Sequence, residues 1–276
     1  MECMDETKAV THDPVEAVGQ AAGRYLYGVT DHGEQTSLGY IGIESRDVYT
    51  VPYQDLCAVV QNCPAQPYHS PDPDVMTQWV VTHHDVVEVA WERFGTILPA
   101  SFDTIIKSEA GGDPQEQVRT WLRQDYESLE KKIERVRGKA EYGVQIFWDP
   151  KLIAGRLMAE SPEIKTLSQE IKAKPKGAAY LYQQKLERAL KQEMEARAAA
   201  YFKDFYQRIK QQVAETRVEK TKKVDKEIQM LLHLACLVYQ ERHTALGDEL
   251  EKIEQMDGFS VRFTGPWPPY SFVSSG

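Results

Sequence analysis

Long apolar runs and densely spaced cysteines are both lacking in this sequence of 276 residues. No window approaches the ~20 apolar residues that a membrane-spanning helix needs, and residues 1–20 lack the apolar core of a signal peptide. The four cysteines, Cys3, Cys57, Cys63 and Cys236, have neither the density nor the spacing of a disulfide framework in a small secreted domain. We therefore expect a protein of a reducing cytosol with no lipid membrane as a partner.

Basic residues are outnumbered by acidic ones, 33 to 42, which gives a formal net charge of −9. A protein that binds nucleic acid usually displaces counterions from phosphates with a basic surface, so we expect no nucleic-acid partner. Apolar residues make up 42% of the chain and charged residues 27%, which is ordinary for a globular protein. The length is ample for burying a core, so the chain as a whole is predicted to fold.

Catalytic and cofactor-binding motifs are missing as well. The sequence contains no GxSxG, no P-loop, no GxGxxG followed by an acidic residue and no HExxH. Its acidic residues are spread along predicted solvated helix faces, without an evident buried pair. The sequence therefore predicts no enzyme and no cofactor.

One histidine pair is the strongest candidate for metal or catalytic chemistry. His84 lies one helical turn before Glu88, and the preceding His83 falls on the apolar stripe of the same predicted helix. Two ligands do not form a zinc site, so core or surface histidines are the favoured interpretation. Cys57 and Cys63 do not form a CxxC pair and are predicted to be buried thiols. We expect no metal site.

The distribution of glycine and proline divides the chain into an extension and two α+β domains. Residues 1–23 carry few large apolar side chains and are predicted to be a flexible N-terminal extension. An N-terminal α+β domain is predicted over residues 24–110, and a C-terminal α+β domain over residues 111–276. The first domain should contain strands over residues 24–30, 48–60 (interrupted at Pro52) and 97–106 (bent at Pro99), a proline-rich connector over 64–73 and a helix over 75–94.

The second domain begins with three helix-start signals together, an N-cap at Asp113, a proline at Pro114 and an acidic residue at Glu116. The helix should end at Gly138. A further helix is predicted to be unusually long, from Pro175 to about Val218, because it contains no internal proline and has apolar residues at helical steps. The remaining expected elements are strands over residues 141–148, 228–239 and 259–264 and short helices over 152–158, 164–171 and 246–253. For residues 228–239, a buried helix remains an alternative to the strand.

The tail Gly265–Phe272 combines three prolines with three aromatic residues. Prolines restrict φ and remove backbone donors, so we expect no regular secondary structure there. A tail that caps the core is the favoured interpretation, and a polyproline-like ligand for a partner is the alternative. We expect Trp267 to be buried and Tyr270 to be partly exposed. The candidate protein-binding residues are Trp267, Pro268, Pro269, Tyr270 and Phe272.

The tail FTGPWPPYSFV, after the strand LLHLACLVY and a short helix, resembles the C-terminal signature of the GvpF/GvpL family of gas vesicle proteins. Other similar segments follow in family order from about Tyr25 to Val273: YLYGV, DLCAVV, ILPASF, EYGVQIF and AAYLYQQKLE. One departure is LPASFDT at residues 98–104, where the family often has an arginine and a glycine in a LPLRFGT-like run. Any role tied to that arginine is not carried over to this chain.

The resemblance implies a two-domain α+β protein whose C-terminal domain has a modified ferredoxin-like core with long helices. It also implies an accessory or minor structural protein of gas vesicles in the cytoplasm, which binds the shell protein GvpA and other vesicle proteins during assembly. Two alternatives remain open at this point. One is a cytosolic small-molecule enzyme or sensor on a ferredoxin-like domain, using His83, His84 and Glu88. The other is a coiled-coil adaptor built on the long helix.

Overall fold

The structure, a computed structural model, describes residues 23–108, 112–173, 175–222 and 228–273. The expected flexible extension over residues 1–22 lies outside the described residues, and Gly23 already begins a strand. The chain forms two compact units. The first comprises the described residues up to Tyr27, His32–Val86 and Ser101–Tyr126, and the second comprises Gly28–Asp31, Val87–Ala100 and Glu127–Gly276. The domain limits predicted from the sequence remain a prediction.

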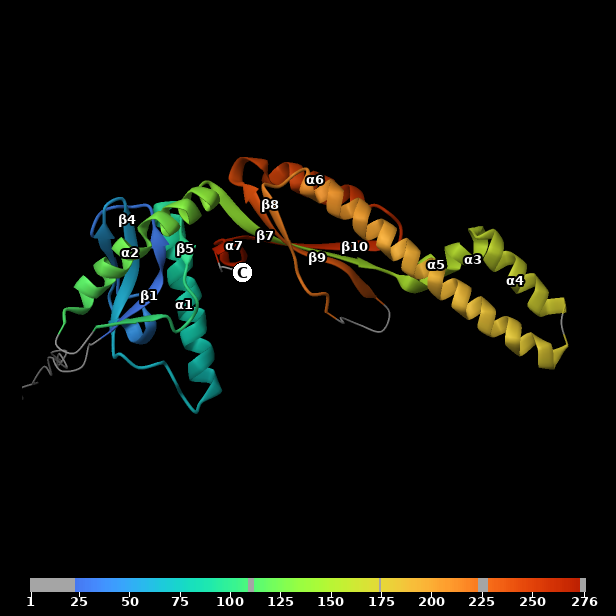
Figure 1. Ribbon diagram of the computed structural model, residues 1–276, viewed down its shortest axis with the longest axis horizontal. Helices are drawn as coiled ribbons and strands as arrows, with labels where there is room; N and C mark the ends of the chain where they lie inside the picture. Colours follow the sequence, from blue (N-terminus) through green and yellow to red (C-terminus); the bar gives the residue numbers. More distant parts are fainter. Residues whose placement is uncertain (1–22, 109–111, 174, 223–227, 274–276) are drawn as a thin grey trace, which may run out of the picture. The chain divides into compact units, whose positions relative to one another are not determined.

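The N-terminal sheet is built around β1 (Figure 1). All eight residues of β1 are buried. Its order is β2-β3-β4-β1-β5, and β6 also pairs with β1. The strands are β1 (Gly23–Thr30), β2 (Ser37–Gly39), β3 (Val48–Tyr53), β4 (Leu56–Cys63), β5 (Leu98–Pro99) and β6 (Ile105–Lys107), with a 3-10 turn η1 (Ile43–Ser45) between β2 and β3. The predicted strand over residues 24–30 is therefore present.

The predicted strand over residues 48–60 is a hairpin of β3 and β4, and its break is not at Pro52. The chain turns at Gln54, which has a positive φ of 53°, while Pro52 lies within β3 opposite Cys57. The short strand β2 pairs with β3 only at Val48 and Tyr49, so no partner on that side needs the N–H that Pro52 lacks.

The single bent strand predicted over residues 97–106 is also wrong. Two short strands replace it, and both pair antiparallel with β1: β5 at Gly28 and Val29, and β6 at Gly23, Arg24 and Tyr25. Between them Asp103 adopts a positive φ of 65°. Its N–H donates to the Tyr25 hydroxyl at 3.1 Å and its carboxylate accepts from the Tyr68 N–H at 2.9 Å. These hydrogen bonds interrupt the pairing with β1 between the two short strands.

The helices α1 (Pro73–Phe94) and α2 (Pro114–Val136) agree with the sequence patterns. The α1 stripe buries His83, Val86, Val87 and Ala90. At the start of α2 the Asp113 carboxylate accepts from the Gln115 N–H at 2.9 Å, as expected for a cap. The helix ends before Gly138, whose φ of 68° is accessible to glycine at little cost.

The second sheet is antiparallel, with the order β10-β7-β9-β8. Its strands are β7 (Lys139–Trp148), β8 (Glu215–Val218), β9 (Gln229–Tyr239) and β10 (Phe259–Trp267). The helices of this unit are α3 (Pro150–Glu160), α4 (Pro162–Ala173), α5 (Lys176–Lys210), α6 (His243–Glu254) and α7 (Tyr270–Val273), with a 3-10 turn η2 (Gln240–Arg242) before α6. The strand prediction for residues 228–239 is confirmed by β9.

One face of the second sheet carries an extended apolar core. Alternate residues of β7 and β9 pack there against α5 and α6, and α3 and α4 extend the same apolar cluster along α5. Figure 1 shows α5 running beyond the sheet, with α3 and α4 beside its first half. The buried residues of this core include Ala140, Tyr142, Val144, Ile146, Trp148, Phe205, Ile209, Leu232, Leu234, Cys236, Val238, Leu246, Leu250 and Ile253.

The long helix ends earlier than the sequence pattern predicts. α5 has 35 residues and stops at Lys210, and Glu215–Val218 form β8 instead of its last turn. The Ala214 N–H donates to the Leu237 carbonyl at 2.9 Å, which begins the pairing with β9. No glycine or proline marks this end. The edge of β9 offers backbone hydrogen-bond partners to residues 214–218, and pairing with them ends the helix.

Phe205 provides a test of this core. Its ring is fully buried and meets the ring of Phe259 edge-on at a centroid distance of 5.1 Å. We predict that Phe205→Ala lowers the free energy of unfolding by ~3–5 kcal/mol, because it removes buried area and leaves a cavity. Lys203→Ala, at an exposed position of the same helix, should change it by less than about 0.5 kcal/mol. Urea unfolding of both variants measures the difference, and equal losses would contradict the assignment.

Candidate functional site

The C-terminal tail has regular structure, contrary to the expectation from its prolines. Residues Gly265–Trp267 continue β10 after an irregularity in its pairing with β7, and Tyr270–Val273 form α7. Pro266 is tolerated within β10 because β10 is the edge strand of its sheet, where a missing N–H leaves no strand unpaired, and Pro268 and Pro269 lie between β10 and α7. Gly265 has a φ of 116°, and a Cβ there would lie 2.8 Å from the Glu141 carbonyl oxygen.

Glu141 of β7 holds α7 in place. Its carboxylate accepts two hydrogen bonds from Ser271, from the N–H at 2.7 Å and from the hydroxyl at 2.6 Å. The Arg135 guanidinium donates to the Phe272 carbonyl at 3.1 Å and also pairs with Glu215. Burial raises the pKa of Glu141, and the Ser271 hydrogen bonds oppose that shift. The tail is thus tied to the strand by one half-buried carboxylate.

The five candidate tail residues differ in exposure. Phe272 is 1% exposed and lies under the Arg217 guanidinium, 5.6 Å from its ring centroid. Pro268 and Pro269 are buried, and Tyr270 is half-buried. Trp267 is 48% exposed, so the expected burial of this ring is wrong. Its position at the end of an edge strand leaves one side of the indole without a neighbouring strand.

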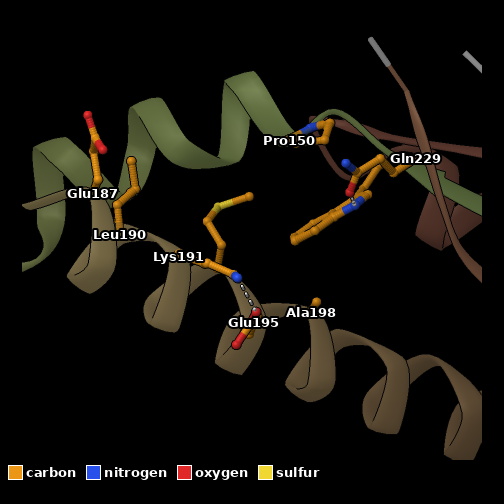
Figure 2. Close-up of a pocket in the computed structure, with 9 residues that line it drawn as sticks. Pro150, Glu187, Leu190, Lys191, Glu195, Ala198 and Gln229 are labelled. Carbon is orange, nitrogen blue, oxygen red and sulfur yellow. Dashed lines mark hydrogen bonds and ion pairs between the residues drawn. The ribbon is translucent and has the colours of Figure 1, made fainter. Parts of the chain in front are cut away.

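A groove of about 530 Å³ lies in the second unit, between α5 and the ends of β7 and β9. Leu190, Met194 and Ala198 recur every four residues on α5 and form one wall. Trp148 is buried at the base, and its indole N–H donates to the Gln229 side-chain oxygen at 3.4 Å. Figure 2 shows Pro150 and Gln229 on the side opposite α5.

The rim of the groove is charged and the wall is apolar. Glu187, Lys191 and Glu195 repeat every four residues on α5 and form a row beside the apolar stripe. The Lys191 ammonium lies 3.9 Å from the Glu195 carboxylate (Figure 2). All three side chains are exposed. Lys191 balances the charge of Glu195, and the rim carboxylate of Glu187 leaves one negative charge in excess. The groove therefore favours an apolar ligand that carries a basic group.

The sequence did not identify this groove. The four-residue spacing of Leu190, Met194 and Ala198 was visible, but such a stripe usually indicates a core face. The missing information was which residues of the sheet side meet α5 where it extends past the sheet. Beyond that point Trp148 and Pro150 are the residues that the sheet side brings to this stripe.

The histidine candidates lie on α1. His83 is 1% exposed, and its Nδ1 lies 2.9 Å from the Tyr25 hydroxyl. His84 is exposed and Glu88 is half-buried. Among the described residues no group of three or more His, Cys, Asp or Glu side chains is placed to hold a metal ion. His83, His84 and Glu88, the candidates of the sensor or enzyme alternative, are thus not part of such a group in the described residues.

The three cysteines within the described residues are buried thiols. Burial raises the pKa of Cys63 to about 11 and those of Cys57 and Cys236 to about 12, so the thiolate that a nucleophile or a zinc ligand requires is disfavoured. No helix in the described part of the chain is long and apolar enough to cross a membrane.

Comparison with known proteins identifies the family of this chain. A model of the family described as gas vesicle synthesis protein GvpL/GvpF matches residues 23–274. The chain belongs to the GvpL/GvpF family. It is 30% identical to gas vesicle protein L1 of Halobacterium salinarum, over 91% of this chain and 90% of that protein. It is also 30% identical to gas vesicle protein L of Haloferax mediterranei, over 84% of this chain and 72% of that protein.

Crystal structures of two GvpF proteins resemble the fold of this family member. The GvpF of an Anabaena species superimposes with a TM-score of 0.71 at 19% identity, covering 92% of this chain and 99% of that one. The GvpF of Microcystis aeruginosa superimposes with a TM-score of 0.64 at 19% identity, covering 92% and 100%. These likenesses support the mixed helix and sheet fold. The resemblance drawn from the tail and the dispersed segments is confirmed.

Unequal burial within the tail predicts unequal effects of truncation. Phe272→Ala should lower the free energy of unfolding by ~3–5 kcal/mol, as for other buried large aromatics. Trp267→Ala should lower it by about 1 kcal/mol, since nearly half of that side chain is already in water. Paired urea unfolding curves measure both. A larger loss for Trp267→Ala than for Phe272→Ala would show that the tail is docked differently.

Glu141 predicts a pH dependence of stability in this GvpL/GvpF protein. Because burial raises its pKa in the folded state, the folded chain binds this proton more tightly than the unfolded chain. The contribution is fully present below the unfolded pKa and is lost as the pH rises through the folded one. In Glu141→Gln this loss is absent, so its unfolding free energy relative to wild type should rise with pH across that window. The prediction would be contradicted if the difference in unfolding free energy between Glu141→Gln and wild type stayed constant from about pH 4 upward, the range in which carboxylates titrate.

Proposed function

We propose that this protein acts in gas vesicle assembly, as an accessory or minor structural component that binds the shell protein GvpA and other vesicle proteins. It works at gas vesicles in the cytoplasm and catalyses no reaction. The names of its relatives support the process, and the groove beside α5 supports binding as the activity. The observation that carries the proposal is the apolar stripe of Leu190, Met194 and Ala198 facing Trp148.

The occupant proposed for this groove is an apolar segment of the shell protein that carries one basic residue. A volume of about 530 Å³ accommodates a few large side chains. Burying them against Trp148 and the α5 stripe supplies the affinity, since apolar contact area is the main source of binding energy at such anchors. The exposed carboxylate of Glu187 at the rim then pairs with the basic group.

The tail supplies a second contact in this proposal. Its buried members, Pro268, Pro269 and Phe272, hold the segment against β7, whereas Trp267 and part of Tyr270 face solvent. A half-exposed tryptophan on a rigid support loses little conformational entropy on binding, which suits it as an anchor for a partner. We therefore keep these five residues as the proposed protein-binding segment.

The second unit is proposed to be a modified ferredoxin-like domain. Support comes from the element series β7-helices-β8-β9-α6-β10, which is the β-α-β-β-α-β order of that fold. The modification is the replacement of the first helix by the three helices α3, α4 and α5. We propose residues 24–110 and 111–276 as the two domains.

Filling the groove should separate binding from folding. Ala198 lines the groove and Ala199, the next residue of α5, is exposed. We predict that Ala198→Phe weakens binding of purified GvpA by at least about tenfold, because the new ring occupies the space of the ligand, while Ala199→Phe leaves it unchanged. Melting temperatures of both variants control for folding.

The measurement is the dissociation constant of each variant for soluble GvpA, together with co-purification of the tagged full-length protein with intact vesicles. Binding by wild type and a loss confined to Ala198→Phe support the proposal. Equal affinity of the two variants for GvpA would show that the groove is not the binding site. If wild type binds neither GvpA nor vesicles, the proposed function itself fails.

A further inference from the structure

The outer edge of β10 has no neighbouring strand in the described part of the chain. β10 is the first strand in the order β10-β7-β9-β8 and pairs only with β7. It is nine residues long, and from Ser260 onward its residues are exposed or half-buried. An edge strand of this length presents a row of backbone groups that can accept a further strand.

The pairing of β10 with β7 sets which of its backbone groups point outward. The Asp149 N–H donates to the Gly258 carbonyl at 2.9 Å. This bond lies just outside the opposed residues Trp148 and Phe259, which therefore form a non-hydrogen-bonded pair. Hydrogen-bonded and non-hydrogen-bonded pairs alternate in an antiparallel ladder, so every second residue after Phe259 also points its N–H and C=O away from β7.

Val261 and Phe263 are the residues with outward backbone groups. Ser260, Arg262 and Thr264 lie between and beside them and direct their N–H and C=O to β7. The outward groups of Val261 and Phe263 make no hydrogen bond with any described residue. They offer two donors and two acceptors at the spacing of an antiparallel ladder. A further strand can therefore pair here without disturbing β7.

The side chains of Val261 and Phe263 lie on the helix-covered face of the sheet, opposite the core residues Ile146 and Val144. The Phe263 ring stacks on that of Tyr142 at a centroid distance of 5.2 Å, yet the residue is 39% exposed. Val261 is half-buried. Apolar residues of a further strand at these two positions would cover the apolar surface that β10 leaves in water.

Arg262 lies on the other face of β10 and carries a charge that no described residue balances. It is exposed, its neighbour on β7 is the neutral Gln145, and it belongs to none of the ion pairs within the described residues. On the outer side of β10 its position is that of a non-hydrogen-bonded pair, in which opposed side chains come closest. An acidic residue there stabilises the pairing and a basic one destabilises it.

The same charge opposes pairing of β10 with a second copy of the chain. The strand FSVRFTGPW contains no acidic residue. An antiparallel pair centred on Val261, Arg262 or Phe263 would place the two Arg262 side chains opposite or diagonal to each other on one face. The partner that fits is therefore another protein with an acidic residue at that position.

We propose that the outer edge of β10 binds an extended segment of another protein as an additional antiparallel strand, with an acidic residue opposite Arg262 and apolar residues on either side of it. This recognition goes beyond the function proposed above. The groove beside α5 favours a ligand with a basic group, whereas this edge favours an acidic one, so the two surfaces select different segments.

The experiment uses the full-length protein and a capped peptide, acetyl-Thr-Thr-Val-Glu-Val-Thr-Thr-amide, with a control peptide that has Lys in place of Glu. Binding is followed by NMR through the backbone amide signals of Val261 and Phe263. We expect saturable shifts of both signals and slower hydrogen exchange of both amides. The Glu peptide should bind at least about fivefold tighter than the Lys peptide, because only its charge is opposite to that of Arg262.

Two variants and a control decide whether this edge is responsible. Val261→Pro removes an outward donor but no hydrogen bond to β7, and it should weaken binding at least about tenfold. Val218→Pro is the matched control on the other edge strand, β8. The Glu219 N–H donates to the His233 carbonyl, so the backbone groups of Val218 also point outward, and this variant should bind as wild type does.

Arg262→Glu tests the charge independently of the backbone, and it decides the matter if Val261→Pro fails to fold by thermal melting. It should reverse the preference, so that the Lys peptide binds more tightly than the Glu peptide.

The proposal is overturned if neither peptide shifts the Val261 and Phe263 signals, if folded Val261→Pro binds as wild type does, or if Arg262→Glu keeps the preference for the Glu peptide. It is also overturned if these amides become protected in the free protein as its concentration rises, because a second copy then occupies the edge. None of these outcomes depends on GvpA, so failure here and failure of the groove are distinguishable.

Discussion

The inside–outside alternation of β7 is the constraint on which the second unit depends. Five of its ten residues, from Ala140 to Trp148 in steps of two, are buried in the helix-covered core, and the intervening residues are half-buried on the opposite face. A slip of one residue in pairing would move Glu141 into the core and Tyr142 out of it. The groove and the docked tail both depend on that register, since Trp148 forms the base of the groove and Glu141 anchors the tail.

The groove follows from a mismatch in length between α5 and the sheet. Near its C-terminal end α5 buries Phe205 and Ile209 against the strands. Its earlier turns extend past the sheet and pack on α3 and α4, which are too short to cover the stripe completely. The stripe of Leu190, Met194 and Ala198 is therefore partly buried rather than sealed.

The first unit is organised by a polar network rather than by apolar packing alone. The Tyr25 hydroxyl meets His83 and accepts from the Asp103 N–H, and the Tyr27 hydroxyl donates to the Gln61 side-chain oxygen at 2.6 Å. Burial raises the pKa of both tyrosines, so these hydroxyls remain neutral donors and acceptors. The same strand directs the adjacent Arg24 to the opposite face. The satisfied network on one side contrasts with the unpaired Nε on the other.

Local signals in the sequence determined most elements of this protein. Asp113 and Gly138 bound α2, the alternation around Tyr142 marks β7, and the tail motif indicated the family, because each depends on neighbours a few residues apart. Tertiary structure decided what depends on distant partners. β9 converts Glu215–Val218 from helix to strand, Asp103 breaks one strand into two, and the edge position of β10 exposes Trp267. The groove belongs to the same class, since it joins segments far apart in the chain and no local spacing encodes their approach.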